Sequence, residues 1–276
     1  MPASDVSSQL GLAGFLREFG SGLRRQGNVI LALMFKEFRG RASRGRLGLF
    51  WVILDPVSKI IVLSLFWYLA RRTEISGVHV ALFVAVAVVP FTILSRSLSS
   101  ISAAIGSNQA YYNYPQVKPI DALIARFMLD MWLLAIGAVL IFFGLGWFMD
   151  LHINLQNTMP FIAVLLLAMA LGFGISLFNG TYGSLYEGYS RVLGFFRRPL
   201  IFVSAVFYTP NDLPAQARYI ISWNPIAQII EYARYYALGI PLFPEASIAY
   251  PAVCALVALF MGFIAYYANR FRLLER

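Results

Sequence analysis

The chain has 276 residues, of which 59% are hydrophobic and only 13% are charged, and its mean hydropathy is +0.70. A soluble domain carries about a quarter charged residues, so this composition excludes an ordinary soluble protein and indicates one embedded in lipid. The net charge of +9 does not indicate nucleic-acid binding, because the basic residues gather at the ends of apolar runs, as in a membrane protein.

The first predicted element is a basic amphipathic helix at 23–41, with the sequence LRRQGNVILALMFKEFRGR. On a helical wheel its large apolar side chains share one arc and two basic side chains point away. The arc holds Ile30, Leu31, Met34, Phe35 and Phe38, and the basic pair is Lys36 and Arg39. Such a helix lies in the plane of the membrane interface. A membrane anchor and a partner-docking element remain equal alternatives on these residues.

Six apolar runs follow, each a candidate for crossing the hydrocarbon core, which takes about 20 residues in a helix. They cover 50–70, 79–102, 122–149, 158–179, 192–209 and 248–268. The third is long enough to tilt, and the fifth is short. The sequence therefore predicts an all-α integral membrane protein with an N-terminal segment at 1–49 and a six-span transmembrane domain at 50–276.

The distribution of Lys and Arg predicts the orientation of these spans. Seventeen of these residues lie beside span ends on the side that carries both termini. The other side has only four, which are Arg71, Arg72, Arg218 and Arg234. By the positive-inside rule, both termini, the N-terminal segment and the connection between spans two and three are cytoplasmic.

The connection between spans two and three is polar, rich in tyrosine and twice broken by proline: residues 107–121 read SNQAYYNYPQVKPID. Ser107 is expected to cap a short helix through the tyrosines, which Pro115 and Pro119 then end. Tyrosine offers a large, rigid contact area with a polar tip, which suits a docking surface. On its residues alone, the segment fits either an ordinary cytoplasmic loop or a protein-docking surface.

The region 210–247, on the external side, contains two apolar pieces that are too short to span the bilayer. Asn224-Pro225 separates them and Gly239 ends the second, so two short re-entrant or interfacial helices are expected. Glu231 and Arg234 have the i,i+3 spacing of an ion pair.

Aromatic residues accompany this external region. Those singled out are Trp223, Tyr232, Tyr235 and Tyr236. An aromatic belt at the membrane interface and the lining of an outer pore mouth both fit them. Aromatic faces also suit sugar rings, and composition alone does not decide between these roles.

Two further pairs of opposite charges lie inside predicted spans. Asp55 and Lys59, and likewise Arg126 and Asp130, are one helical turn apart. An ionisable residue inside a membrane indicates a functional site unless a partner neutralises it. Whether these two pairs are functional or structural stays open at the level of sequence.

Several motifs of chemical sites are absent from the sequence. It contains no GxxxxGK[ST] phosphate loop, no HExxH and no GxSxG. The single cysteine, Cys254, excludes a disulfide framework and a thiolate metal site. We therefore expect no catalytic residue, cofactor or metal on this chain.

Three stretches in order carry a resemblance to a known family. LGLFWVILDP at 47–56 resembles the entry to the first span of type 2 ABC exporter permeases, with its pattern LGxxWxxLxP. RPLIFVSAVFYTPNDLP at 198–214 and WNPIAQIIEYARYYALG at 223–239 are similar to that family's fifth span and following external helices. The match covers nearly the whole chain and looks closest to the permeases that export capsular polysaccharide in Gram-negative bacteria.

The resemblance implies a homodimer in the bacterial inner membrane that works with two separate ATPase subunits, which hold ATP and Mg. It implies an interfacial N-terminal helix, a cytoplasmic coupling helix and two periplasmic gate helices. A lipid-linked polysaccharide would pass through a channel at the dimer interface to a periplasmic adaptor and an outer-membrane conduit. This chain would then be a channel-forming subunit and not itself an enzyme.

The resemblance also implies roles for particular residues. Contact with the ATPase is expected of Tyr111, Tyr112, Tyr114, Pro115, Val117 and Lys118, beside Phe35, Lys36, Phe38 and Arg39. The gate or substrate path is expected to include Trp223, Glu231, Tyr232, Arg234, Tyr235, Tyr236, Arg71 and Arg72. Arg71 and Arg72, together with Arg197 and Arg198, either attract anionic sugars or anchor lipid headgroups.

Other functions stay open as alternatives. Within the ABC class, the exported molecule could instead be an O-antigen, a teichoic acid, a lipid or a drug. A membrane enzyme acting on glycan lipids would need clustered acidic or histidine residues, which the sequence lacks. A proton-coupled transporter would show paired halves with interrupted helices, and no such internal repeat is visible.

Overall fold

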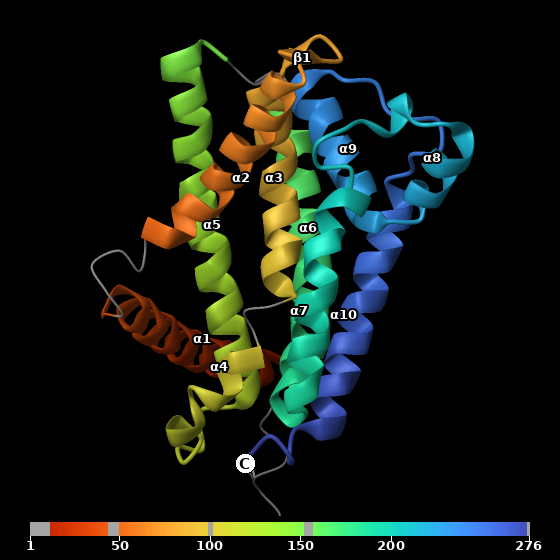
Figure 1. The fold of residues 1–276 in the computed structure, drawn as a ribbon. Helices are drawn as coiled ribbons and strands as arrows, with labels where there is room; N and C mark the ends of the chain where they lie inside the picture. Colours follow the sequence, from red (N-terminus) through yellow and green to blue (C-terminus); the bar gives the residue numbers. More distant parts are fainter. Residues whose placement is uncertain (1–11, 44–49, 99–101, 152–156, 275–276) are drawn as a thin grey trace, which may run out of the picture.

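The structure is a computed structural model that describes residues 12–43, 50–98, 102–151 and 157–274, most of them helical. The longer helices are α1 (Leu12–Ser43), α2 (Phe50–Leu69), α3 (Val80–Ser97), α5 (Pro119–Met149), α6 (Thr158–Leu185), α7 (Glu187–Val203), α9 (Pro225–Leu238) and α10 (Ala249–Asn269). The short elements are β1 (Glu74–Ile75), β2 (Val78–His79), α4 (Ser102–Gly106), α8 (Ala215–Ser222) and the 3₁₀ turns Gln109–Tyr111 and Pro210–Asp212. Figure 1 shows one elongated bundle with α1 lying across one end.

Four of the helices are long and apolar enough to cross a membrane: α3, α5, α6 and α10, with mean hydropathies between 1.9 and 2.6. α2 and α7, of 20 and 17 residues, are the helices that match the first and fifth predicted runs. The prediction of a helical, multi-pass membrane protein is therefore confirmed.

α3 forms the centre of the bundle, where it contacts α2, α5, α6 and α9. Every residue of α3 except Arg96 is buried. A helix that is apolar on all sides lies inside a protein or a membrane, and here α3 does so within a single subunit.

α6 and α10 cross at two glycines that allow their backbones to touch. A Cβ atom on Gly174 would lie 2.4 Å from the carbonyl carbon of Ala258, and one on Gly262 would lie 2.6 Å from the carbonyl oxygen of Gly174. Small residues at helix crossings are the usual means of close packing within a membrane. These glycines therefore account for the closeness of the α6–α10 pair.

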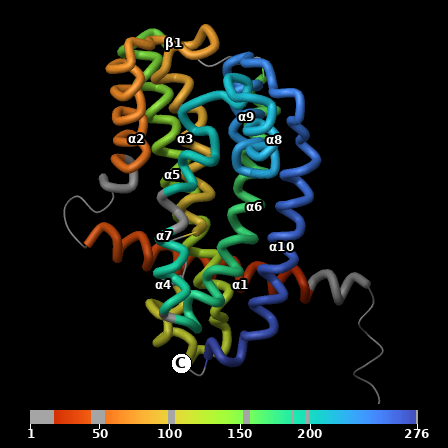
Figure 2. Tube along the Cα trace, turned by 45° about the vertical axis from the view of Figure 1, so that its right-hand side comes forward, coloured from red at the N-terminus to blue at the C-terminus, as the bar shows by residue number. Residues whose placement is uncertain are grey.

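The two ends of the bundle carry different sets of connections. The hairpin β1–β2, α8 and α9 lie at one end, and α1, α4 and the chain's C-terminal part lie at the other (Figures 1 and 2). The hairpin closes through a two-residue turn, Ser76 and Gly77, with φ of 52° and 76°, as expected for a tight hairpin turn. This placement confirms that segments assigned to opposite sides of the membrane lie at opposite ends.

The predicted bounds differ from the structure at several elements, including α1 and α7. α1 is described from Leu12, well before the predicted start at 23, and α7 ends at Val203 instead of reaching 209. The chain turns at Ala205, which has a φ of 54°, and the carbonyls of Val206 and Tyr208 accept hydrogen bonds from Arg234. Hydrogen bonds from Arg234 therefore take the place of the next turn of helix at these carbonyls. The apolar run in the sequence does not indicate this distant partner.

Candidate functional site

The tyrosine-rich segment lies at the α1 end of the bundle, between α4 and α5. The prediction that Ser107 caps a helix there was wrong, because the only helical turn is the 3₁₀ turn Gln109–Tyr111, preceded by Asn108. Asn108 is buried and donates through its Nδ2 to the carbonyl of Ala104, 2.7 Å away. The segment is thus a braced loop and not a coupling α-helix. We call residues 107–118 the docking loop.

The tyrosines of the docking loop divide into an inner and an outer set. Tyr114 and Tyr111 are 60% and 40% exposed. Tyr112 points inward, where its hydroxyl donates to the carbonyl of Ile105 at 3.1 Å. Burial raises the pKa of Tyr112 well above its usual value, so the phenol keeps its proton. Tyr112 therefore anchors the loop, and Tyr111 and Tyr114 are the rings that it presents.

α1 holds the docking loop through one basic residue. The Lys36 ammonium donates to the Ser107 carbonyl at 2.7 Å and to Asn108 Oδ1 at 2.8 Å. It also lies 4.8 Å from the centre of the Tyr111 ring, within the range of a cation–π contact. Lys36, which is predicted to contact a partner, ties the loop to α1.

Polar contacts also join α1 to α5, both before and after Lys36 along α1. Gln26 Nε2 donates to Asp121 Oδ1 at 2.6 Å, and Arg41 Nη1 lies 2.5 Å from Asp130 Oδ1. Arg126 lies 3.7 Å from Glu37 Oε2. Both members of the predicted Arg126–Asp130 pair therefore have partners on α1. The α1–α5 contact and the docking loop form one connected unit.

The apolar face of α1 differs from the predicted arc. Ile30 and Met34 do pack toward α5, around the buried Leu33. Leu31 and Phe35 are exposed on another side of the helix. A helix in the membrane interface can pack one face against protein and present another to lipid, and both faces are then apolar. The predicted arc combined residues that belong to these two different faces.

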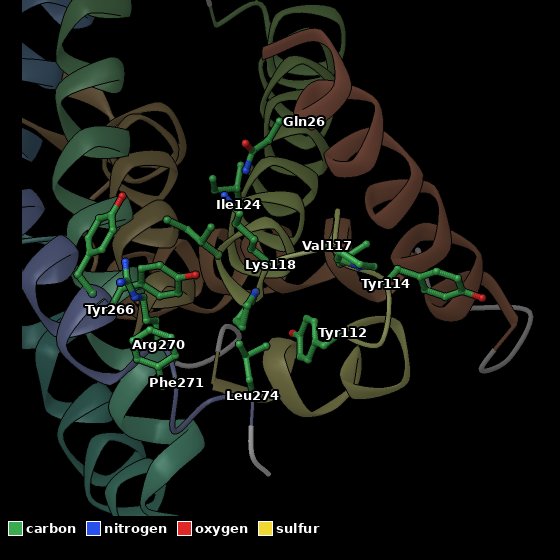
Figure 3. A pocket seen from close by; sticks show the side chains of 14 residues that line it. Gln26, Tyr112, Tyr114, Val117, Lys118, Ile124, Tyr266, Arg270, Phe271 and Leu274 are labelled. Atoms are coloured by element: carbon green, nitrogen blue, oxygen red, sulfur yellow. The ribbon is translucent and has the colours of Figure 1, made fainter. Parts of the chain in front are cut away.

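A groove of about 540 Å³ opens beside the docking loop. Its walls come from three separate parts of the chain, as Figure 3 shows. The labelled lining residues are Gln26 of α1, Tyr112, Tyr114, Val117, Lys118 and Ile124 of the loop and α5, Tyr266 of α10, and Arg270, Phe271 and Leu274 just after α10. Predicted docking residues therefore share a site with the C-terminal part of the chain.

The charge at this groove is positive. Lys118 and Arg270 line it, while the nearby Asp121 carboxylate accepts from the Lys118 backbone amide and from Gln26. The Arg270 guanidinium lies 4.7 Å from the centre of the Phe271 ring. The groove thus offers cationic and aromatic groups together, a combination that suits an acidic or aromatic partner surface.

At the opposite end, the predicted Glu231–Arg234 pair is confirmed, with Nη1 2.7 Å from Oε1. Arg234 has no exposed side-chain area and also donates to the carbonyls of Tyr208 and Val206, while its guanidinium lies 3.7 Å from the Phe83 ring centre. The pair joins α9 to α3 and to the turn after α7. Its contacts are those of an internal brace.

The other gate candidates occupy mixed positions. Trp223 is exposed, Tyr232 is buried, and the rings of Tyr235 and Tyr236 are 5.0 Å apart. Arg71 and Arg72 are exposed just before the β1–β2 hairpin. The side chains of Arg197 and Arg198 lie outside the described residues.

Sequence reasoning missed several groups of the α1-end site. These are Gln26, Glu37, Arg41, Asp121, Tyr266, Arg270, Phe271 and Leu274. The signal available for α1 was polar residues recurring at helical spacing, Gln26, Glu37 and Arg41, on the side facing α5. The α10 residues had no comparable signal, because only the fold brings 266–274 beside the docking loop. Among the described residues, no group of three or more His, Cys, Asp or Glu is arranged to hold a metal ion.

Comparison with known proteins gives a consistent result. Residues 28–238 match the family model described as ABC-2 type transporter. The chain is similar to the polysialic acid transport protein KpsM of Escherichia coli, with 29% identity over 89% of this chain and 95% of the relative. It is also similar to the capsule polysaccharide export inner-membrane proteins BexB of Haemophilus influenzae and CtrC of Neisseria meningitidis. Each is 25% identical over 92% of its own length, covering 89% and 88% of this chain.

Proposed function

Because the chain belongs to the ABC-2 type transporter family, we propose that it is the permease subunit of an ATP-driven exporter of lipid-linked capsular polysaccharide. The names of the similar proteins support this substrate: KpsM is a polysialic acid transport protein, and BexB and CtrC are capsule polysaccharide export inner-membrane proteins. Their similarity extends over nearly the whole length of both chains. O-antigen, teichoic acid, lipid or drug export is the less well supported alternative.

The membrane arrangement proposed is six spans, α2, α3, α5, α6, α7 and α10, in the bacterial inner membrane with both termini in the cytoplasm. The distribution of basic residues supports this orientation, and so does the location of the docking loop and the chain's C-terminal part at one end. α8 and α9 are proposed as the short gate helices of the periplasmic end.

The single observation that carries the coupling proposal is the docking loop, which exposes Tyr111 and Tyr114 yet is tied to α1 and α5. A separate ATPase that binds this loop would move α1 and the start of α5 with it. We propose that ATP and Mg are bound by that partner and that two copies of each subunit assemble. We further propose transfer of the polymer to a periplasmic adaptor and an outer-membrane conduit.

The test is co-purification of the full-length permease with its ATPase subunit, combined with export of the polymer in cells. The variant Tyr114→Ala with Lys118→Glu changes an exposed ring and a groove charge, and we expect it to lose most of the bound ATPase and most export. Tyr112→Ala is avoided because that ring anchors the loop. Tyr219→Ala changes an exposed ring on α8 at the other end of the bundle, and it is the control for ATPase binding. Undiminished ATPase binding and export in the double variant would refute the docking assignment.

A further inference from the structure

A second cavity lies between α6, α7 and α10, apart from the α1-end groove. Its volume is about 290 Å³, and its lining includes Ile175, Phe178, Asn179, Tyr189, Ala258 and Met261. Gly174, at the crossing of α6 and α10, also lines it. Apart from Asn179 and Tyr189, these lining side chains are apolar.

Asn179 is the unusual group in this cavity. The residue is 5% exposed, and its Oδ1 accepts a 2.7 Å hydrogen bond from the Tyr189 hydroxyl. Its Nδ2 has no hydrogen-bond partner. An unpaired buried donor is unfavourable, most of all where no bulk water is available. The Asn179 NH₂ group therefore needs a hydrogen-bond acceptor that the protein does not supply. The bond from Tyr189 to Oδ1 fixes the amide in the orientation that leaves this NH₂ group unpaired.

The depth of Asn179 indicates which acceptor is nearby. α6 has 28 residues, so it is about 42 Å long, close to the full thickness of a bilayer including both headgroup regions. Asn179 is six residues from the last residue of α6, Leu185, or about 9 Å along the helix. Headgroup regions take up roughly 6 Å on each side, so Asn179 lies near the boundary where the acyl ester carbonyls of lipids are found.

Aromatic rings flank the cavity toward the membrane surface. The Tyr182 ring centre is 4.7 Å from that of Phe178, 6.3 Å from that of Tyr186 and 6.2 Å from that of Tyr189. Tyrosines at this depth are typical neighbours of lipid headgroups. On the deeper side, Ile175, Ala258 and Met261 provide an apolar wall suited to a hydrocarbon chain.

We propose that this cavity binds an ester-linked glycerolipid, with Asn179 Nδ2 donating to an acyl carbonyl oxygen and the chain lying against α6 and α10. The shared chemistry fits two sources, a resident phospholipid or the lipid anchor of the exported polymer. Lipid binding by this site depends only on the subunit being in a membrane. Assignment to the anchor rests on the proposed export function.

The binding experiment compares two forms of phosphatidylglycerol with the same chains, one ester-linked and one ether-linked, by native mass spectrometry of the full-length protein. The ether form lacks the carbonyl oxygen. We expect the wild type to bind the ester form about tenfold more tightly, the size of one hydrogen bond within a membrane. Asn179→Leu should abolish this preference, and Tyr189→Phe, which frees the amide, should reduce it. If the wild type binds the ester-linked and ether-linked forms with equal affinity, that measurement alone overturns the proposal.

A matched control is Thr181→Val, which removes a buried hydroxyl from the same part of α6. Thr181 Oγ1 donates to the Leu177 carbonyl within the helix and does not line the cavity, so this variant should keep the ester preference. Loss of the preference in Thr181→Val would point to a general disturbance of α6 and contradict the role of Asn179.

Export in cells distinguishes the two lipid sources. If the polymer's anchor occupies the site, Asn179→Leu lowers export while ATPase binding stays normal. If a resident phospholipid occupies it, Asn179→Leu weakens binding of the ester-linked lipid in mass spectra and export persists. The phosphatidylglycerol measurement needs neither ATPase nor polymer, so it can fail or succeed independently of the proposed function.

Discussion

At the scale of single residues, the protein uses buried polar groups mainly to connect segments that are far apart in the chain. Lys36 and Arg234 both belonged to predicted functional sets, and both prove to be ties between elements. The sequence did indicate the pairing of Glu231 with Arg234, because the two residues have the i,i+3 separation of an ion pair. The burial of Arg234 was not readable, because it depends on the elements that cover it.

Arg234→Met should be strongly destabilising. It leaves the buried Glu231 carboxylate without its partner and two carbonyls without their donor. Breaking a buried pair in this way costs about 3–5 kcal/mol, which a shift in the midpoint of denaturant unfolding in detergent would report. Arg218→Met, in a partly exposed pair with Glu245, should cost less than about 1 kcal/mol.

A second variant separates the charge from the packing. Glu231→Leu combined with Arg234→Met removes both charges, so it should be more stable than Arg234→Met alone. If the double variant is as unstable as the single one, the loss comes from the carbonyl contacts and not from an unpaired carboxylate.

At the scale of helices, a mostly helical, multi-pass chain is confirmed. The errors are the helix predicted through the tyrosines, the ends of several helices and the face that α1 buries. Asn224 caps α9 by accepting from the Ile226 amide, and Gly239 ends it with a φ of 71°, as the local sequence indicated. The end of α7 depends instead on Arg234, some 30 residues later in the chain. The sequence therefore predicted the helix ends that are set by capping residues next to them in the chain, as in α9.

Gly174→Ala tests the α6–α10 contact. The new Cβ atom would meet backbone atoms of Ala258 and Leu259 at 2.4 Å, so one helix must move. We expect a loss of at least 1–3 kcal/mol, about what overpacking costs, measured as a lower unfolding midpoint in detergent. Gly144→Ala on α5, where a Cβ atom meets nothing within 4 Å, is the control, and an equal loss in both would contradict the crossing as the cause.

At the scale of the whole molecule, the docking loop, α1 and the end of α10 lie at one end, and the hairpin with α8 and α9 lies at the other. The length of α6 matches the thickness of a bilayer between these ends. Because the bundle is proposed to span the membrane, a reagent on one side of the membrane should reach the elements at one end of the bundle only.

Cysteine labelling tests this arrangement. In a Cys254→Ser background, Asn113→Cys in the docking loop and Ile220→Cys in α8 replace exposed residues. A membrane-impermeant maleimide added to whole cells with a permeable outer membrane should label position 220 alone. Position 113 should react only after the inner membrane is opened. Labelling of both positions from the same side would contradict the proposed spans.

By itself, the sequence determined the membrane class, the order of the helices and the end at which each connection lies. Those properties follow from local quantities: the length of apolar runs, the caps and the counts of basic residues. Only the tertiary structure decided which polar groups meet. Gln26 and Asp121 are 95 residues apart in the chain, Arg41 and Asp130 are 89 apart, and the Asn179 cavity needs three helices. Such pairings depend on how the helices pack, and no local pattern encodes that.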